Sequence, residues 1–253
     1  MSKFSVVIVC RNEAGIIGRT LQSLQGISDD IVVFDNGSTD GTQDIVLKYG
    51  ARLIEGSWEG FGKTKYKAIL LARHDWVLSL DADESIDETL KMSLLGLSLD
   101  NDLVVYDLTF RNFLGNKYLR YGEWGGDHHV RLFNRIRVNY NDAHVHETLD
   151  MPSNVIVKKL EGFVLHQTMR DIVEYSQKMV QYAMLNAVKY QQQGKKANWF
   201  KIRFSPGFTF LNYYILKLGF LDGHAGYVCA KMTAWYTFMK YARLKELNDA
   251  GAR

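Results

Sequence analysis

Residues 1–86 alternate between two kinds of hydrophobic pattern. Continuous apolar runs, typical of strands buried on both faces of a sheet, are followed by segments whose apolar residues recur at helical spacing. The predicted strands are FSVVIVC, DIVVFD, ARLIEG and DWVLSL, and the predicted helices between them are IIGRTLQSLQGI, TQDIVLKYG and GKTKYKAILLARH. Alternation of this kind predicts an α/β domain of Rossmann-like type, with a mainly parallel sheet and helices on both faces.

The alternation loosens after residue 86. The pattern in residues 87–168 indicates one helix followed by strands and loops, which we expect to complete the α/β domain. From Met169 the apolar residues return at helical spacing and predict a long amphipathic helix, then two apolar, aromatic helices around a glycine-rich bend. The sequence therefore predicts an α/β domain over 1–168 and a C-terminal helical appendage over 169–253.

Polar clusters follow three of the predicted strands. They are Asn12-Glu13, the acidic turn from Asp35 to Asp40, and the run from Asp81 to Glu84. Because ligands of parallel α/β sheets bind at the carboxyl ends of the strands, the three clusters predict one shared site.

The run DADE, residues 81–84, crowds three carboxylates at the end of a buried strand. Mg²⁺ or Mn²⁺ would remove their repulsion, since both ions prefer oxygen ligands and often share them with substrate phosphates. The alternative is that Asp83 and Glu84 cap the helix expected near Asp87. The second acidic turn, DNGSTDGT, favours a site for a nucleotide diphosphate. Neither a P-loop nor a dinucleotide-binding glycine motif is present.

The composition of the chain bears on whether it contacts a membrane. The 253 residues are 47% hydrophobic and carry a formal net charge of +3, with Lys and Arg outnumbering acids after Met169. A basic, aromatic region of this kind suits anionic lipid, and the alternative is a helical subdomain packed on the sheet. We expect contact with a membrane surface through residues 205–253, without a helix that spans the bilayer. We also expect no signal peptide, no disulfide between Cys10 and Cys229, and no nucleic-acid partner.

Four blocks carry a family resemblance. SVVIVCRNEAGIIGRTLQSL, DDIVVFDNGSTDGTQDIV, GFGKTKYKAILLA and DWVLSLDADE resemble family 2 glycosyltransferases with the GT-A fold, over residues 4–86. Later blocks, YGEWGGDHHVRLFNR, AHVHETL, FVLHQT and GFLDGHAGY, resemble bacterial lipopolysaccharide core glucosyltransferases of the WaaE/LgtF kind.

This resemblance implies an inverting transfer of a hexose from a UDP-sugar, UDP-glucose in the first place, to a sugar of the lipopolysaccharide inner core, with Mg²⁺ or Mn²⁺. Residues 1–86 would be the nucleotide-sugar half and 87–168 the acceptor half. The enzyme would be cytoplasmic and peripheral on the inner face of the inner membrane. Alternatives are a transferase for another surface glycan and a non-catalytic sugar-nucleotide-binding or membrane-assembly protein.

The resemblance also implies roles in donor binding. Asp35 would accept a hydrogen bond from the uracil imide, and Asn12 and Glu13 would line the nucleoside pocket. Lys65 would lie near the base and phosphates. Asp81 would contact ribose, a metal-bound water or the metal.

Metal and base roles follow from the same resemblance. Asp83 would bind the metal directly. His166 would be a further metal ligand or contact the diphosphate. The alternative is a structural histidine at the end of a strand, whose hydrogen bonds are made within the protein. Glu147 is the expected general base and Asp127 its rival, because a carboxylate near the acceptor can take the hydroxyl proton. For either acid the alternative is a helix cap or an acceptor-binding residue.

Overall fold

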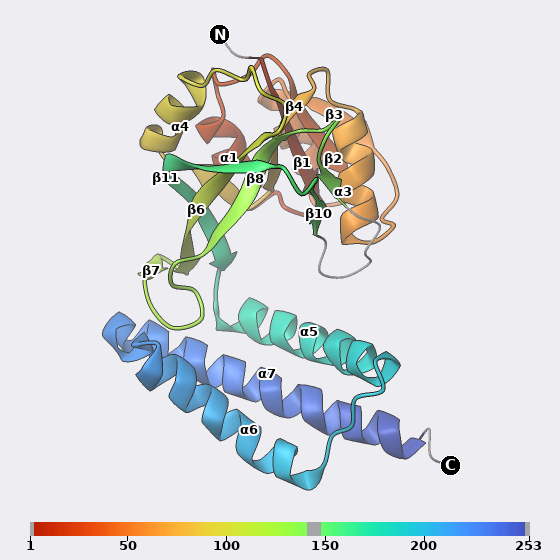
Figure 1. Ribbon diagram of the computed structural model, residues 1–253, viewed down its shortest axis with the longest axis vertical. Coiled ribbons are helices and arrows are strands. Elements are labelled where there is room, and N and C mark those ends of the chain that lie inside the picture. The colour runs from red at the N-terminus through yellow and green to blue at the C-terminus, as the bar shows by residue number, and fades with distance from the viewer. Residues whose placement is uncertain (1–2, 141–147, 251–253) are drawn as a thin grey trace. The chain divides into compact units, whose positions relative to one another are not determined.

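The computed structural model describes residues 3–140 and 148–250, which form two compact units (Figure 1). The first unit comprises Met1–Phe110 and Asp127–His166, and the second Arg111–Gly126 and Gln167–Arg253. Residues 111–126 therefore group with the C-terminal helices, although they fall before residue 168 in the sequence. The expected domain boundary at 168/169 stays a prediction.

Parallel strands form one half of the sheet in the first unit. Their order is β3-β2-β1-β4, with β1 at Ser5–Cys10, β2 at Ile31–Asp35, β3 at Arg52–Glu55 and β4 at Trp76–Asp81. The helices between them are α1, Ile17–Ser23, α2, Thr42–Lys48, and α3, Phe61–Leu70. All the strands and helices expected before residue 82 are present. In the β1–β2 and β1–β4 registers, Cys10 lies opposite Asp35 and Val9 opposite Asp81, so the three strand ends coincide.

Antiparallel strands continue the sheet beyond β4. Strand β8, His128–Asn134, pairs antiparallel with both β4 and β6, Val104–Leu114, and β11, Ile156–Met169, pairs antiparallel with β5, Glu84–Ile86. The remaining elements are α4, Glu88–Leu95, β7, Lys117–Leu119, which pairs with β6, and a small sheet of β9, Asn139–Tyr140, and β10, Leu149–Asp150. The expected α/β class is confirmed, and the sheet is mixed.

Strand β1 shows how the sequence buries both faces of this sheet. Val6 and Ile8 belong to a core that includes residues of α1, α2 and α4, such as Leu21, whereas Val7 belongs to a second core that includes Ala68 of α3. Successive side chains of a strand point to opposite faces, so a continuous apolar run is the pattern that two cores require. Helices on both faces are thereby confirmed.

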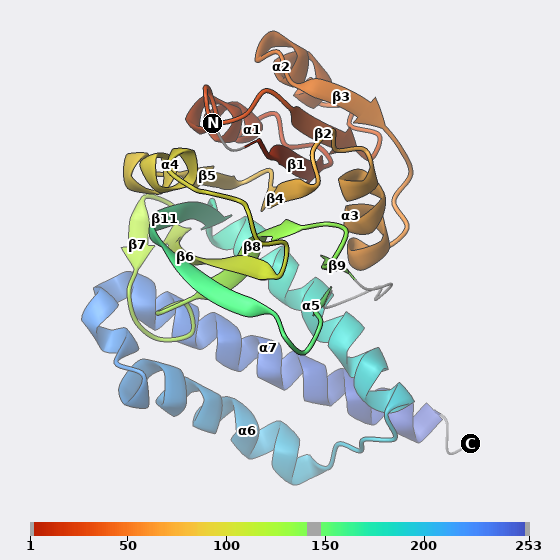
Figure 2. The ribbon, with the colours of Figure 1, turned by 45° about the horizontal axis from the view of Figure 1, so that its top comes forward.

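Three long helices dominate the second unit. They are α5, Ile172–Gln192, α6, Trp199–Leu211, and α7, Gly223–Ala250, and α6 is followed by a π-helical turn, Asn212–Leu216, and a 3₁₀ turn, Gly219–Asp222. Helix α7 packs against both α5 and α6 and lies between them in both ribbon views (Figures 1 and 2). The side chains of Asp171 and Asn198 cap α5 and α6 by accepting hydrogen bonds from backbone N–H groups. Among the helices that the structure describes, none has the length and hydropathy needed to cross a bilayer.

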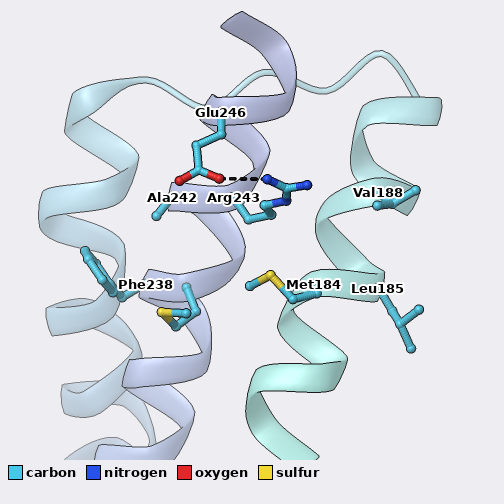
Figure 3. Close-up of a pocket in the computed structure, with 8 residues that line it drawn as sticks. Met184, Leu185, Val188, Phe238, Ala242, Arg243 and Glu246 are labelled. Carbon is cyan, nitrogen blue, oxygen red and sulfur yellow. Dashed lines mark hydrogen bonds and ion pairs between the residues drawn. The ribbon is translucent and has the colours of Figure 1, made fainter. Parts of the chain in front are cut away.

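A groove of about 630 Å³ runs between α5 and α7 (Figure 3). It is lined by Met184, Leu185, Val188, Phe238, Met239, Ala242, Arg243 and Glu246. At one end the Arg243 guanidinium pairs with the Glu246 carboxylate at 2.9 Å. The groove contains none of the residues predicted to bind donor, metal or acceptor.

Strand β11 passes close to the first turn of α4, and glycine is required at the crossing. Asp87 accepts hydrogen bonds from the backbone N–H groups of Leu90 and Phe163. Gly162 has φ of +97°, and a Cβ placed there would lie 2.1 Å from the Leu90 nitrogen.

We therefore expect Gly162→Ala to lower the free energy of unfolding by about 2–5 kcal/mol, through left-handed strain and overpacking together. Gly26→Ala is the matched control, because Gly26 has φ of +79° and open space around its Cα, so strain alone should cost about 1–2 kcal/mol. Urea denaturation measures both, and equal losses would contradict the close crossing.

Candidate active site

The loop after β1 is joined to the acidic turn after β2 by hydrogen bonds. The Asn12 N–H donates to Ser38 Oγ at 2.8 Å, and Asn12 Oδ1 accepts from the Thr39 N–H at 2.9 Å. The Glu13 N–H donates to Thr42 Oγ1 at 2.8 Å. Asn12 has φ of +56°, a conformation that asparagine tolerates better than most residues. The structure thus brings Asn12 and Glu13 beside the acidic turn.

Asp35 ends β2 and is fully buried. Its carboxylate accepts hydrogen bonds from the Ser38 N–H at 2.9 Å, Gln43 Nε2 at 2.7 Å, Cys10 Sγ at 3.5 Å and the Ser38 hydroxyl. Burial raises the pKa of Asp35, but the hydrogen bonds from Ser38 and Gln43 outweigh it and the pKa is lowered. A uracil imide that donates to Asp35 would have to replace or share one of these donors, and that role stays a prediction.

Asp81 ends β4 between two cations. Lys65 Nζ of α3 lies 2.8 Å from Asp81 Oδ1, and Arg131 Nη2 of β8 lies 3.4 Å from Asp81 Oδ2. The Lys65 side chain is only 7% exposed, whereas that of Asp81 is 36% exposed. Burial raises the pKa of Asp81, but the charges of Lys65 and Arg131 outweigh it and hold the pKa well below its usual range.

Glu84, which is fully buried, forms a second pair with Arg131. Arg131 Nη2 donates to Glu84 Oε1 at 2.6 Å, and Glu84 Oε2 accepts from the Asp81 N–H at 2.8 Å. Burial raises the pKa of Glu84 even though Arg131 opposes the shift. The alternative in which Glu84 caps the next helix is wrong, because Asp87 caps α4.

Asp83 lies beside His166, with 3.6 Å between Asp83 Oδ2 and His166 Nε2. His166 is opposite Glu84 in the β5–β11 register, and its ring meets the edge of Phe110 at 6.1 Å between centroids. Burial lowers the pKa of His166, but Asp83 and the other two carboxylates outweigh it and the pKa is raised above 6.5. An oxygen and a nitrogen ligand are thus together, which suits Mn²⁺ or Mg²⁺ with further oxygens from a diphosphate or water.

No group of three or more His, Cys, Asp or Glu side chains in the described part of the chain is arranged to hold a metal ion. The expected set of Asp81, Asp83 and His166 is divided: Asp83 pairs with His166, while Asp81 is paired with Lys65 and Arg131.

The two candidate bases differ in what the structure shows. Asp127 Oδ1 lies 2.9 Å from His129 Nε2, and the His129 ring packs on Phe110 at 5.1 Å between centroids. Glu147 lies outside the described residues. The neighbouring His128 pairs with Asp107 at 2.8 Å, so the two adjacent histidines contact different carboxylates.

The local sequence pattern does not select the partners of Arg131 or the contact between Lys65 and Tyr140. Lys65 Nζ lies 5.5 Å from the centroid of the Tyr140 ring, whose hydroxyl donates to Ser79 Oγ at 3.3 Å. His129 and Arg131 are two positions apart on β8, so the alternation of the strand places both side chains on one face. This spacing is the sequence signal from which their shared face could be predicted.

Comparison with known proteins identifies the family. The profile of the family described as Glycosyl transferase family 2 matches residues 5–150. The chain belongs to glycosyl transferase family 2. This match confirms the resemblance stated from the sequence, and it makes the protein an enzyme of the glycosyltransferase class.

Relatives of this family 2 glycosyltransferase extend over nearly its whole length. The lipopolysaccharide core biosynthesis glycosyltransferase LpsC of Rhizobium meliloti is 28% identical over 98% of this chain and 94% of its own. An uncharacterized glycosyltransferase of Rickettsia prowazekii is 27% identical over 98% of this chain and 88% of its own. Glucosyl-3-phosphoglycerate synthase of Mycobacterium tuberculosis, solved with Mn²⁺, UDP and glucosyl-3-phosphoglycerate, is 24% identical over 45% of this chain and 44% of its own, with a TM-score of 0.35.

The raised pKa of His166 predicts a pH-dependent stability. The folded, metal-free enzyme keeps this proton at pH values where the unfolded chain releases it. Its contribution is therefore complete below pH 6.5 and is lost as the pH rises through the folded pKa.

We expect the difference in unfolding free energy between the wild type and His166→Gln to shrink as the pH rises above 6.5. Urea denaturation in EDTA measures this difference. A difference independent of pH would mean that the carboxylates around Asp83 do not hold the His166 proton.

Proposed function

We propose that this family 2 glycosyltransferase transfers a hexose, glucose from UDP-glucose in the first place, to a sugar of the lipopolysaccharide inner core, with inversion at the anomeric carbon. One observation carries the donor site: the carboxyl ends of β1, β2 and β4 coincide and bring Asn12, Asp35 and Asp81 to one edge of the sheet. Similarity to LpsC, named for lipopolysaccharide core biosynthesis, supports the acceptor class.

Donor binding would use the two acidic turns differently. The turn at Asp35, with Asn12 and Glu13, would take the nucleoside, and the buried Lys65 ammonium would face the phosphates near Asp81. Asp83 and His166 would hold Mg²⁺ or Mn²⁺, with Asp81 in contact through ribose or a metal-bound water. When bound, the metal would stabilise the negative charge that develops on the departing diphosphate.

The transfer would be a single displacement. The acceptor oxygen would attack the anomeric carbon opposite the diphosphate, the C–O bond to the diphosphate would break, and UDP would leave with the bonding electrons. The acceptor proton would pass to a carboxylate, Glu147 in the first place and Asp127 as the rival. The contact of Asp127 with His129 would hold that carboxylate in place.

We also propose that the enzyme works in the cytoplasm at the inner face of the inner membrane, where a lipid-linked core acceptor would be presented. The basic, aromatic composition after Met169 supports this location.

Asp83→Ala is expected to lower glucose transfer at least about 100-fold, because the metal contributes several kcal/mol of transition-state stabilisation. The assay combines UDP-glucose, Mn²⁺ and a truncated core oligosaccharide, with product detected by mass spectrometry. Asp44→Ala is the matched control, since Asp44 is an exposed acid on α2.

Full activity of Asp83→Ala would remove the metal role from this residue. Should the wild type bind UDP but turn over no donor with any glycan acceptor, the non-catalytic alternative would be favoured instead.

For the base, Glu147→Gln is expected to lose transfer by about 100-fold or more while retaining UDP-glucose affinity, because the carboxylate acts only on the acceptor proton. Rates come from the same transfer assay and affinity from calorimetry. If Glu147→Gln keeps full activity while Asp127→Asn loses it, the base is Asp127.

A further inference from the structure

Helix α6 carries an apolar stripe that faces solvent. The stripe consists of Phe200, Phe204, Phe208, Leu211 and Ile215, all of them exposed, with Phe208 at 68%. Spacings of four, four, three and four residues keep the five side chains on one side of the helix and of the π-helical turn that continues it. No residue of α6 is buried, although 9 of its 13 residues are hydrophobic or glycine and proline.

The opposite face of α6 packs on α7. Thr209 Oγ1 donates to Thr237 Oγ1 at 3.3 Å, and the Phe210 ring meets Tyr227 edge-on at 5.9 Å between centroids. The Lys231 ammonium lies 4.8 Å from the centroid of the Phe210 ring. Because these contacts fix the side of α6 that faces the bundle, the stripe points away from it.

The turns after α6 extend the exposed apolar surface. Leu216 is 70% exposed, and Leu218, Phe220 and Leu221 are exposed as well. Trp199 continues the surface at the start of the helix, with 67% of its area exposed. We call residues 199–221 the α6 surface. Large apolar patches of this kind on a folded protein mark an interaction site.

The charged residues around the α6 surface indicate what kind of partner covers it. From Lys195 to Leu221 the sequence contains five basic residues and no Asp or Glu. The basic residues are Lys195, Lys196, Lys201, Arg203 and Lys217, and all are exposed. Aromatic and aliphatic side chains flanked by cations alone match a bilayer with anionic headgroups.

We propose that the α6 surface lies in the interface of an anionic lipid bilayer, with the stripe among the acyl chains and the basic side chains at the headgroups. Helix α6 has 13 residues, fewer than the roughly 20 needed to span a bilayer, so it would lie along the surface. The inference rests on the proposed function in one respect only, namely that a lipid-linked acceptor gives the enzyme a reason to bind there.

The surface differs from the one expected from sequence. Residues 205–253 were expected to contact the membrane together, but α7 buries a row of residues between α5 and α6, and Cys229, Ala230, Thr233, Ala234 and Thr237 belong to it. The proposal therefore assigns membrane contact to residues 199–221.

The apolar contribution is tested with Phe200→Ser/Phe204→Ser/Phe208→Ser in the full chain. Flotation with vesicles of phosphatidylglycerol and phosphatidylethanolamine should show wild-type binding, reduced at least about 10-fold in this variant. The matched control, Leu47→Ser/Met92→Ser/Ile136→Ser, removes three equally exposed apolar side chains from the first unit and should bind like the wild type.

The charge contribution is tested with Lys201→Glu/Arg203→Glu. Binding to the anionic vesicles should fall roughly 10-fold or more, whereas Lys158→Glu/Lys159→Glu, which changes exposed cations of β11, should have little effect. Vesicles of phosphatidylcholine alone should bind the wild type weakly.

Two readouts keep this test separate from the transfer reaction. Circular dichroism melting checks that each variant is folded, and transfer to the water-soluble oligosaccharide should be unchanged in the α6 variants. Vesicle binding without transfer by the wild type would overturn the proposed function and leave the membrane inference standing.

Absence of wild-type vesicle binding would overturn the membrane inference, as would equal binding by the triple serine variant. So would light scattering that shows a wild-type dimer broken by the same three substitutions, because a second copy of the chain would then cover the stripe.

Discussion

The buried ion pair between Arg131 and Glu84 is the constraint on which the site depends. Glu84 is 1% exposed, and a carboxylate removed from water in this way is destabilising unless a charged partner and hydrogen bonds replace its hydration. Arg131 supplies the charge at 2.6 Å and the Asp81 N–H supplies a further hydrogen bond. Since Arg131 belongs to β8 and Glu84 to β5, the pair joins two strands that are not neighbours in the sheet.

The same pair determines how charge is distributed over the three acids of DADE. Asp81 is neutralised by Lys65 and shares Arg131 with Glu84, so the protein's own two cations offset two of the three carboxylates. Asp83 has the titratable His166 beside it. In the interpretation from sequence, a metal relieves the repulsion among all three acids. In the structure, the negative charge of Asp83 is balanced by a group that itself titrates, so this balance changes with pH and with a bound ligand.

The fold of residues 4–81 was predictable because β1, β2 and β4 are short, mainly apolar runs between turn residues, and only β3, RLIE, departs from this pattern. Parallel strands joined by helices have few possible arrangements, so the meeting of Asn12, Asp35 and Asp81 at one edge followed from the pattern. The antiparallel half was less predictable, because β11 alone runs through 14 residues of mixed polarity. The pairing of Arg131 with Glu84 spans 47 residues, and nothing in the local pattern selects Glu84 over the other acids.

The C-terminal helices show a further limit of composition as a guide. Both α6 and α7 are rich in aromatic residues, yet α7 packs on two helices and α6 on one. The difference lies in small side chains: Gly226, Ala230, Thr233, Ala234 and Thr237 recur at helical spacing on α7 and allow close approach of its neighbours. The stripe of α6 carries only large side chains, from Phe200 to Ile215. Large apolar residues without such small ones to receive a neighbouring helix remain exposed. On α6 they are flanked by cations, and the sequence from Lys195 to Leu221 has no Asp or Glu, which is why lipid suits this surface better than another helix of the same bundle.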